Sequence, residues 1–229
     1  MDFLPELRRR RESIVEKDAH RKYVETGEIN RVVYTIQQSI GGISDSFDNP
    51  NQARKRAGQL FENLISLIIQ NLGVECESRT ISVPILGFPD YKMSYQLDLV
   101  FSLDKAIVAS ETKLLHESEI VGSVKTTSKD RIDKIFLDKY LLSQFLGRDV
   151  TMIAVFLHDV QRAARGNSIF GINSTFKTNH FLGYTVALNK MDGVYYVDPR
   201  PEMSKNERLR EQISNFQQLL VQDLWRLPK

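Results

Sequence analysis

The sequence predicts a mixed α/β domain whose central β-sheet is flanked by helices. Helical periodicity is clearest at 56–73, where apolar side chains recur three and four positions apart and Gly73 ends the pattern. Apolar and β-branched segments indicate strands at 74–85, 95–102 and 106–114. A second helical pattern at 123–146 precedes a segment at 150–160 whose apolar and β-branched residues are typical of a fully buried strand. Alternating helices and strands of this kind are typical of one sheet covered by helices.

The remaining segments extend this architecture at both ends. Residues 3–40 have a helical composition that Gly41-Gly42 is expected to break. The helix at 123–146 is long enough to be a crossover, which would make the strands on either side of it parallel neighbours. Beyond it we expect a long loop, two further strands and an amphipathic C-terminal helix, at 159–181, 182–189, 193–198 and 206–227.

Length and composition favour one large soluble domain. The chain has 229 residues, of which 41% are apolar, and its net charge of +2 comes from 31 basic and 29 acidic residues. The longest strongly apolar run, 64–73, is too short to span a bilayer. Because Cys76 is the one cysteine and no export signal is apparent, we expect a cytoplasmic protein without membrane association.

Three charged residues interrupt the predicted hairpin formed by 95–102 and 106–114. Asp98 lies inside the first strand, and Glu111 and Lys113 close the second. Residues two apart on a strand face the same side, so Glu111 and Lys113 would point together. Two neighbouring carboxylates repel each other unless a cation lies between them. The pattern therefore predicts either a structural ion-pair cluster or a site for Mg²⁺, which binds carboxylates, backbone carbonyls and waters.

Asp98, twelve intervening residues and then Glu111-Thr112-Lys113 resemble the motif of the PD-(D/E)XK nuclease superfamily. The basic stretch SVKTTSKDR that follows is similar to those of type II restriction endonucleases. The resemblance covers 56–160 and implies a restriction-endonuclease-like core with Mg²⁺ as cofactor. It implies that Asp98 and Glu111 hold the metal with the Thr112 backbone carbonyl, and that Lys113 assists the attacking water.

Two further acids bear on this site. Glu62, at the edge of the apolar stripe of the first clear helix, is a candidate metal ligand, since a helix acid often supports the metal in this family. Pro89-Asp90 reproduces the letters of the motif name, and Asp90 is the alternative first acid. We favour Asp98 because it interrupts an apolar strand, where an unpaired carboxylate is costly, whereas Asp90 lies in a turn-like segment.

Basic and amide side chains suited to DNA lie in two segments. Cations and hydroxyls after the motif suit phosphates, and the long loop at 159–181 offers side chains that pair with guanine or adenine. The predicted DNA-binding residues are Lys125, Thr126, Thr127, Lys129, Arg131, Arg162, Arg165, Asn167, Asn173 and Lys177. Cleavage of both strands of a palindrome calls for a homodimer, and either the N-terminal helices or the apolar tail around Leu219, Leu220, Leu224 and Trp225 could supply its interface.

We therefore interpret the chain as one nuclease domain, 1–229, acting on double-stranded DNA as a type II restriction enzyme. Its parts would be a helical N-terminal appendage at 1–50, a catalytic core at 56–160, and a DNA-reading loop, strands and helix at 159–229. Two alternatives remain: a repair or junction-resolving nuclease of the same fold, and a DNA-binding regulator in which the charged residues are structural.

Overall fold

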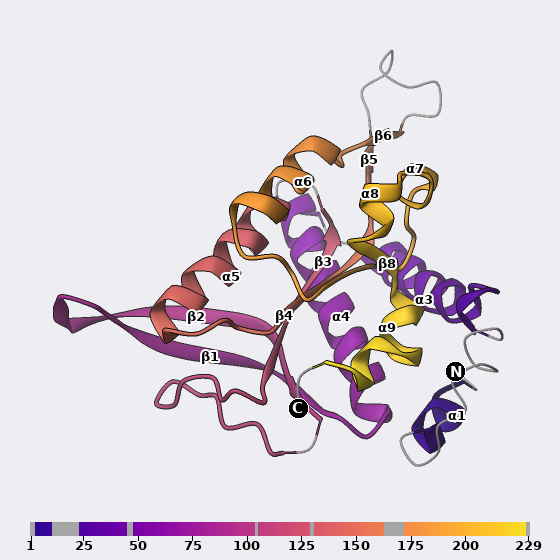
Figure 1. Cartoon of the computed structure of the whole chain (residues 1–229). Helices are drawn as coiled ribbons and strands as arrows, with labels where there is room; N and C mark the ends of the chain where they lie inside the picture. Colours follow the sequence, from indigo (N-terminus) through magenta and orange to yellow (C-terminus); the bar gives the residue numbers. More distant parts are fainter. Residues whose placement is uncertain are drawn as a thin grey trace.

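The computed structural model describes residues 3–10, 23–44, 48–103, 105–128, 131–162 and 172–227. Within them, six strands form a mixed sheet in the order β1-β2-β3-β4-β7-β8 (Figure 1). The first three strands are antiparallel neighbours, and β3, β4, β7 and β8 run parallel. Their bounds are β1 Glu75–Ile85, β2 Phe88–Ser102, β3 Ile120–Thr127, β4 Met152–His158, β7 Gly193–Tyr196 and β8 Ile213–Asn215. The predicted fold class, a central mixed sheet flanked by helices, is confirmed.

Helices cover both faces of this sheet. Along β4, Ile153 and Val155 pack in one hydrophobic cluster with α1, α3, α4 and α9, whereas Ala154 and Phe156 pack in another with α5, α6 and α8. This alternation is the two-residue period of a strand buried on both faces. The helices are α1 Phe3–Arg10, α3 Glu28–Ser44, α4 Pro50–Asn71, α5 Ile132–Leu146, α6 Thr178–Ala187, α7 Pro201–Lys205, α8 Glu207–Arg210 and α9 Phe216–Val221.

The strands β2 and β3 pair over a short distance and then separate. Their register joins Leu99 to Gly122, Val100 to Val121 and Phe101 to Ile120, and β2 continues beyond it in a long hairpin with β1 (Figure 1). A side chain at Gly122 would place its Cβ 3.2 Å from the Cβ of Leu99, so glycine allows the close approach of the two strands. The point of separation positions the site described below.

The strand predicted at 106–114 is wrong, because this segment is a loop between β2 and β3. The buried carboxylate of Glu119 accepts hydrogen bonds from the backbone N–H groups of Val108, Ala109 and His116, at 2.5, 3.0 and 2.6 Å. These amides are therefore satisfied by a side chain and need no strand partner. The strand that pairs with β2 on this side is instead β3, an interior strand of the sheet whose residues were predicted to begin the crossover helix.

Other boundaries also differ from the sequence prediction. The crossover is confirmed, but it joins β3 to β4 through α5. Residues 182–187, predicted as a strand, belong to α6, which packs on α5 through the rings of Phe136 and Phe181. Gly41-Gly42 lies within α3, and the C-terminal helix is divided into short elements around β8. In each case tertiary packing overrides local propensity.

The N-terminal and C-terminal segments share the core of the sheet. Asn30 of α3 and Gln217 of α9 exchange two buried hydrogen bonds of 3.3 and 3.0 Å. Three leucines of the tail that were candidates for a dimer interface, Leu219, Leu220 and Leu224, are fully buried in this core, and the indole of Trp225 donates to the Leu220 carbonyl at 3.1 Å. Among the described residues, no helix combines the length and apolarity needed to cross a membrane.

We expect Glu119→Ala to lower the free energy of unfolding by about 2–4 kcal/mol, because it leaves backbone amides at a buried position without their acceptor. Chemical denaturation checks this value. The matched control is Glu117→Ala, an exposed residue of the same loop, for which we expect a change within about 0.5 kcal/mol. Equal effects of the two substitutions would contradict the role of Glu119.

Candidate functional site

Asp98 is the first residue of β2 beyond its pairing with β3. Its Oδ2 accepts hydrogen bonds from the Val124 backbone N–H at 2.9 Å and from the Ser123 hydroxyl at 3.2 Å. The Val124 amide would otherwise lose a backbone partner where the strands separate, so the carboxylate takes the place of a ladder acceptor. Asp98 is thus held in one position by the local geometry of the sheet.

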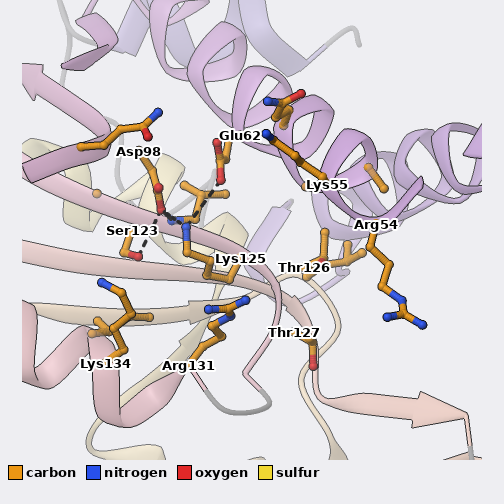
Figure 2. A pocket seen from close by; sticks show the side chains of 18 of the residues that line it. Arg54, Lys55, Glu62, Asp98, Ser123, Lys125, Thr126, Thr127, Arg131 and Lys134 are labelled. Atoms are coloured by element: carbon orange, nitrogen blue, oxygen red, sulfur yellow. Dashed lines mark hydrogen bonds and ion pairs between the residues drawn. The ribbon is translucent and has the colours of Figure 1, made fainter. Parts of the chain in front are cut away.

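Lys125 lies between Asp98 and Glu62. Its ammonium group pairs closely with Asp98 and lies 3.5 Å from Glu62 Oε1 (Figure 2). Glu62 reaches the site from α4, where its neighbour Phe61 is fully buried and fixes that turn against the sheet. The helix begins with Asn49 as the N-cap, whose side chain accepts from the Asn51 N–H, and Pro50 follows in the first turn.

The two carboxylates influence each other. Partial burial raises the pKa of Glu62 above its usual value, and the Asp98 carboxylate raises the pKa further. The Lys125 ammonium acts in the opposite direction and lowers the pKa of Glu62. The cluster has two acids and one cation, so a further positive charge at this point would be favourable.

The cluster lies in a large open groove with a volume of about 1680 Å³. The strands β2 and β3 form its floor, α3 and α4 form one wall, and α5 lies on the other side. Figure 2 shows the cations and hydroxyls around the acids, which are Arg54, Lys55, Thr126, Thr127, Arg131 and Lys134. Asp138 of α5 also lines the groove and pairs with Lys134 at 2.5 Å. The surroundings suit a polyanionic ligand.

Glu111 and Lys113 are not on a strand, which contradicts the geometry on which their predicted roles depended. Both side chains are exposed in the loop between β2 and β3, where the backbone of Lys113 bridges to Ser110. Thr112, the predicted carbonyl ligand, is in the same exposed turn. In the described part of the chain, no hydrogen bond or ion pair joins Glu111 or Lys113 to Asp98.

Asp90, the alternative first acid, belongs to the outer part of the β1–β2 hairpin. Its side chain is exposed, and the segment around it is part of β2 rather than the turn predicted from its sequence. Asp98, in contrast, is partly buried in contact with Ser123 and Lys125. Of the two acids, the structure brings Asp98 to the groove together with Glu62.

The predicted DNA-binding residues fall into three groups. Lys125, Thr126 and Thr127 are on β3, and Arg131 is at the start of α5; all four line the groove. Arg162 belongs to β5 (Val160–Arg162), Asn173 to β6 (Ile172–Ser174), and the exposed Lys177 precedes α6. Lys129, Arg165 and Asn167 lie outside the described residues.

The position of Lys125 beside the acids was missed, although the sequence contains a signal for it. Ser123 and Lys125 are two residues apart and follow the apolar pair Ile120-Val121, which is a strand pattern ending in polar residues. The helical periodicity that starts at Ile132 was extended too far back and obscured this strand. Ser123-Val124-Lys125 therefore occupies the place in the sheet that was expected for Glu111-Thr112-Lys113.

The side-chain oxygens of the cluster could serve as metal ligands. No group of three histidine, cysteine, aspartate or glutamate side chains that could hold a metal occurs among the described residues. Two carboxylates do converge, and hard divalent cations accept such oxygen ligands together with several waters. Glu62 and Asp98 therefore fit Mg²⁺ as a pair of ligands in an otherwise hydrated site.

Comparison with known proteins gives one fold-level result. No protein-family model matches the chain, and the search of curated proteins found no match. Among solved structures, the chain is similar to the type IIP restriction endonuclease Kpn2I, with a TM-score of 0.66 and 16% sequence identity. The match covers 98% of this chain and 69% of Kpn2I. At this identity the likeness shows a restriction-endonuclease fold.

We expect Glu62→Gln to raise the free energy of unfolding near pH 7 in the absence of metal. Because the pKa of Glu62 is raised on folding, its ionised form costs stability above the ordinary carboxyl value of 4.5. The advantage of the variant should shrink as the pH falls through that region and vanish where wild-type Glu62 is protonated. Thermal unfolding at a series of pH values measures this difference. A variant less stable than wild type at pH 7 would contradict the described electrostatics.

Proposed function

We propose that the chain is a Mg²⁺-dependent endonuclease that hydrolyses phosphodiester bonds in double-stranded DNA at specific sequences, as type II restriction enzymes do. The observation that carries the proposal is the convergence of Glu62, Asp98 and Lys125 on the floor of a groove with cationic walls. The similarity of the fold to Kpn2I supports it.

Each residue of the cluster has a role in this proposal. The oxygens of Asp98 and Glu62 would hold Mg²⁺, which would supply charge neutralisation at the phosphate and acidify a water. Lys125 would direct its ammonium to the attacking water or to a phosphate oxygen. Ser123 and the Val124 amide keep Asp98 oriented. Attack in line would release the 3′ oxygen and leave a 5′ phosphate.

The groove surroundings provide the DNA contacts of the proposal. Thr126, Thr127 and Arg131 extend from the cluster along the groove and suit backbone phosphates. Asn173 and Lys177, near β6, are proposed to read base edges together with the rest of 159–181. Cutting both strands of a palindromic site requires two such clusters, so the active form is proposed to be a two-fold homodimer.

Substitutions within the cluster should separate cleavage from binding. We expect Asp98→Asn, Glu62→Gln and Lys125→Ala each to lower the cleavage rate by about 10²-fold or more, because the first two weaken a metal ligand and the third removes the cation that faces the water or the phosphate. Binding to the same duplex, measured by fluorescence anisotropy, should change far less. Lys113→Ala and Glu111→Gln are the matched controls and should cleave as wild type does. If Lys113→Ala abolished cleavage and Lys125→Ala did not, the site would be the one predicted from the loop motif.

Incubation with a long mixed-sequence DNA, with and without Mg²⁺, tests the activity itself. Discrete fragments that require Mg²⁺ are expected. Preferential cutting of branched DNA would favour a repair or junction-resolving nuclease, whereas binding with a steep salt dependence and no cutting would favour a DNA-binding regulator.

Substitutions near β6 test where sequence is read. We expect Asn173→Ala and Lys177→Ala to lower the ratio of cleavage rates at the preferred site and at a site with one changed base pair, because a lost base contact is worth about 1–3 kcal/mol of discrimination. Competition cleavage of the two duplexes measures this ratio. An unchanged ratio would exclude this segment from base reading.

A further inference from the structure

One wall of the groove consists of α3 and the first half of α4, and we call it the α3–α4 wall. It includes Gln37, Gly41 and Gly42 of α3 and Arg54 and Lys55 of α4. None of these residues belongs to the acidic cluster, and the sequence analysis gave this segment no role in binding DNA. Packing within the described chain does not explain why glycines lie inside a helix here, why the two cations have no carboxylate partner, or why the amide oxygen has no donor.

The two glycines lie within a helix. Glycine costs about 0.5–1 kcal/mol relative to alanine in a helix interior, so a pair of them needs a reason. Neither has a positive φ, and a Cβ at Gly41 or Gly42 would meet no described atom within 4 Å. Packing among the described residues therefore does not require glycine at these positions. A ligand that approaches the helix backbone from the groove would require it.

The two cations present positive charge to the groove. Arg54 and Lys55 are both exposed, and Figure 2 shows them on α4 beyond Glu62, on the side away from Arg131 and Lys134. Within the described residues, Arg54 donates to the neutral side chain of Asn51 at 3.2 Å, and neither cation is paired with a carboxylate. Charges that no acid neutralises are available for phosphates.

Gln37 adds an amide with an unused acceptor. The residue is 4% exposed, and its Nε2 donates to the Ala57 carbonyl at 3.4 Å, which fixes the orientation of the amide. Its Oε1 has no hydrogen-bond partner among the described residues, and a buried acceptor without a partner is costly. Because this oxygen is buried, a base of the duplex cannot reach it, and its donor would be an ordered water between the wall and the ligand.

We propose that the α3–α4 wall binds the DNA duplex on the side of the scissile phosphate opposite α5. Arg54 and Lys55 bind phosphates, and Gly41-Gly42 lets the duplex approach the α3 backbone. An ordered water between the wall and the duplex completes the hydrogen bonds of Gln37. This inference rests on the proposed function for its choice of ligand, and it makes the N-terminal helices part of the DNA interface.

Binding without metal tests the wall independently of cleavage. Gly42→Leu should keep or raise the melting temperature, because leucine favours helix, yet weaken the binding of a mixed-sequence duplex about tenfold or more by occlusion. Anisotropy titrations in EDTA measure the dissociation constant. If no ligand binds on this side of α3, the variant should have a higher melting temperature and an unchanged dissociation constant for DNA. That result would overturn the proposal.

The cations are tested through salt dependence. Arg54→Ala/Lys55→Ala should reduce the slope of log K against log salt by about 1.8, since each lost phosphate contact contributes about 0.9. The control Lys205→Ala/Arg208→Ala removes two exposed cations from helices outside the groove and should leave the slope unchanged. Equal slopes for both double variants, or no duplex binding by the wild type, would overturn the proposal. Wall-dependent binding without Mg²⁺-dependent cleavage would support the wall and reject the proposed function.

Discussion

The hydrogen bond from the Val124 amide to the Asp98 carboxylate, at the point where β2 and β3 separate, determines how the rest of the site is built. It satisfies a backbone donor that has lost its ladder partner, and it places a negative charge where the sheet opens into the groove. Ser123 and Lys125 then donate to the same oxygen. The opening of the sheet and the charge of the site are thus one feature. Asparagine at this position could keep the acceptor and lose the charge, which is why that substitution separates structure from chemistry.

The cluster contains more negative than positive charge. Lys125 neutralises part of the charge of Asp98 and Glu62, yet burial and Asp98 still raise the pKa of Glu62. Two acids and one lysine leave a net negative charge in a groove whose other charged lining residues are mostly cations, namely Arg54, Lys55, Arg131 and Lys134, with Asp138 as the exception. A divalent ion would neutralise the charge of the two acids, so that the lysine could interact with another group. A purely structural ion pair would be more stable with equal numbers of positive and negative charges. This imbalance distinguishes a functional reading of the cluster from a structural one.

The sequence predicted the layers of the fold better than the composition of the site. The apolar stripe of α4, the apolar run of β4 and the crossover before it follow from periodicity, and Asp98 stood out because it interrupts an apolar strand. The three-residue segment that lies beside Asp98 in the sheet could not be identified in the same way, because both Glu111-Thr112-Lys113 and Ser123-Val124-Lys125 follow apolar segments. What decides between them is Glu119, whose buried carboxylate accepts three loop amides and so keeps the first triplet out of the sheet. That is a tertiary interaction, which local sequence propensity cannot predict.

The groove combines segments that are far apart in the chain, and its walls are held by packing rather than by the site itself. The first turn of α3 is anchored because Asn30 exchanges buried hydrogen bonds with Gln217 near the C-terminus, and Gln37 ties the helix to the Ala57 carbonyl of α4. A wall positioned in this way loses little conformational freedom when a ligand binds, so more of the contact energy is available for affinity. Such a preformed groove suits a stiff partner, because a rigid duplex cannot adapt its own shape to make up for a mobile wall. If the proposed duplex binds here, the glycines of α3 meet that constraint, because the helix then has to provide the space that the duplex needs.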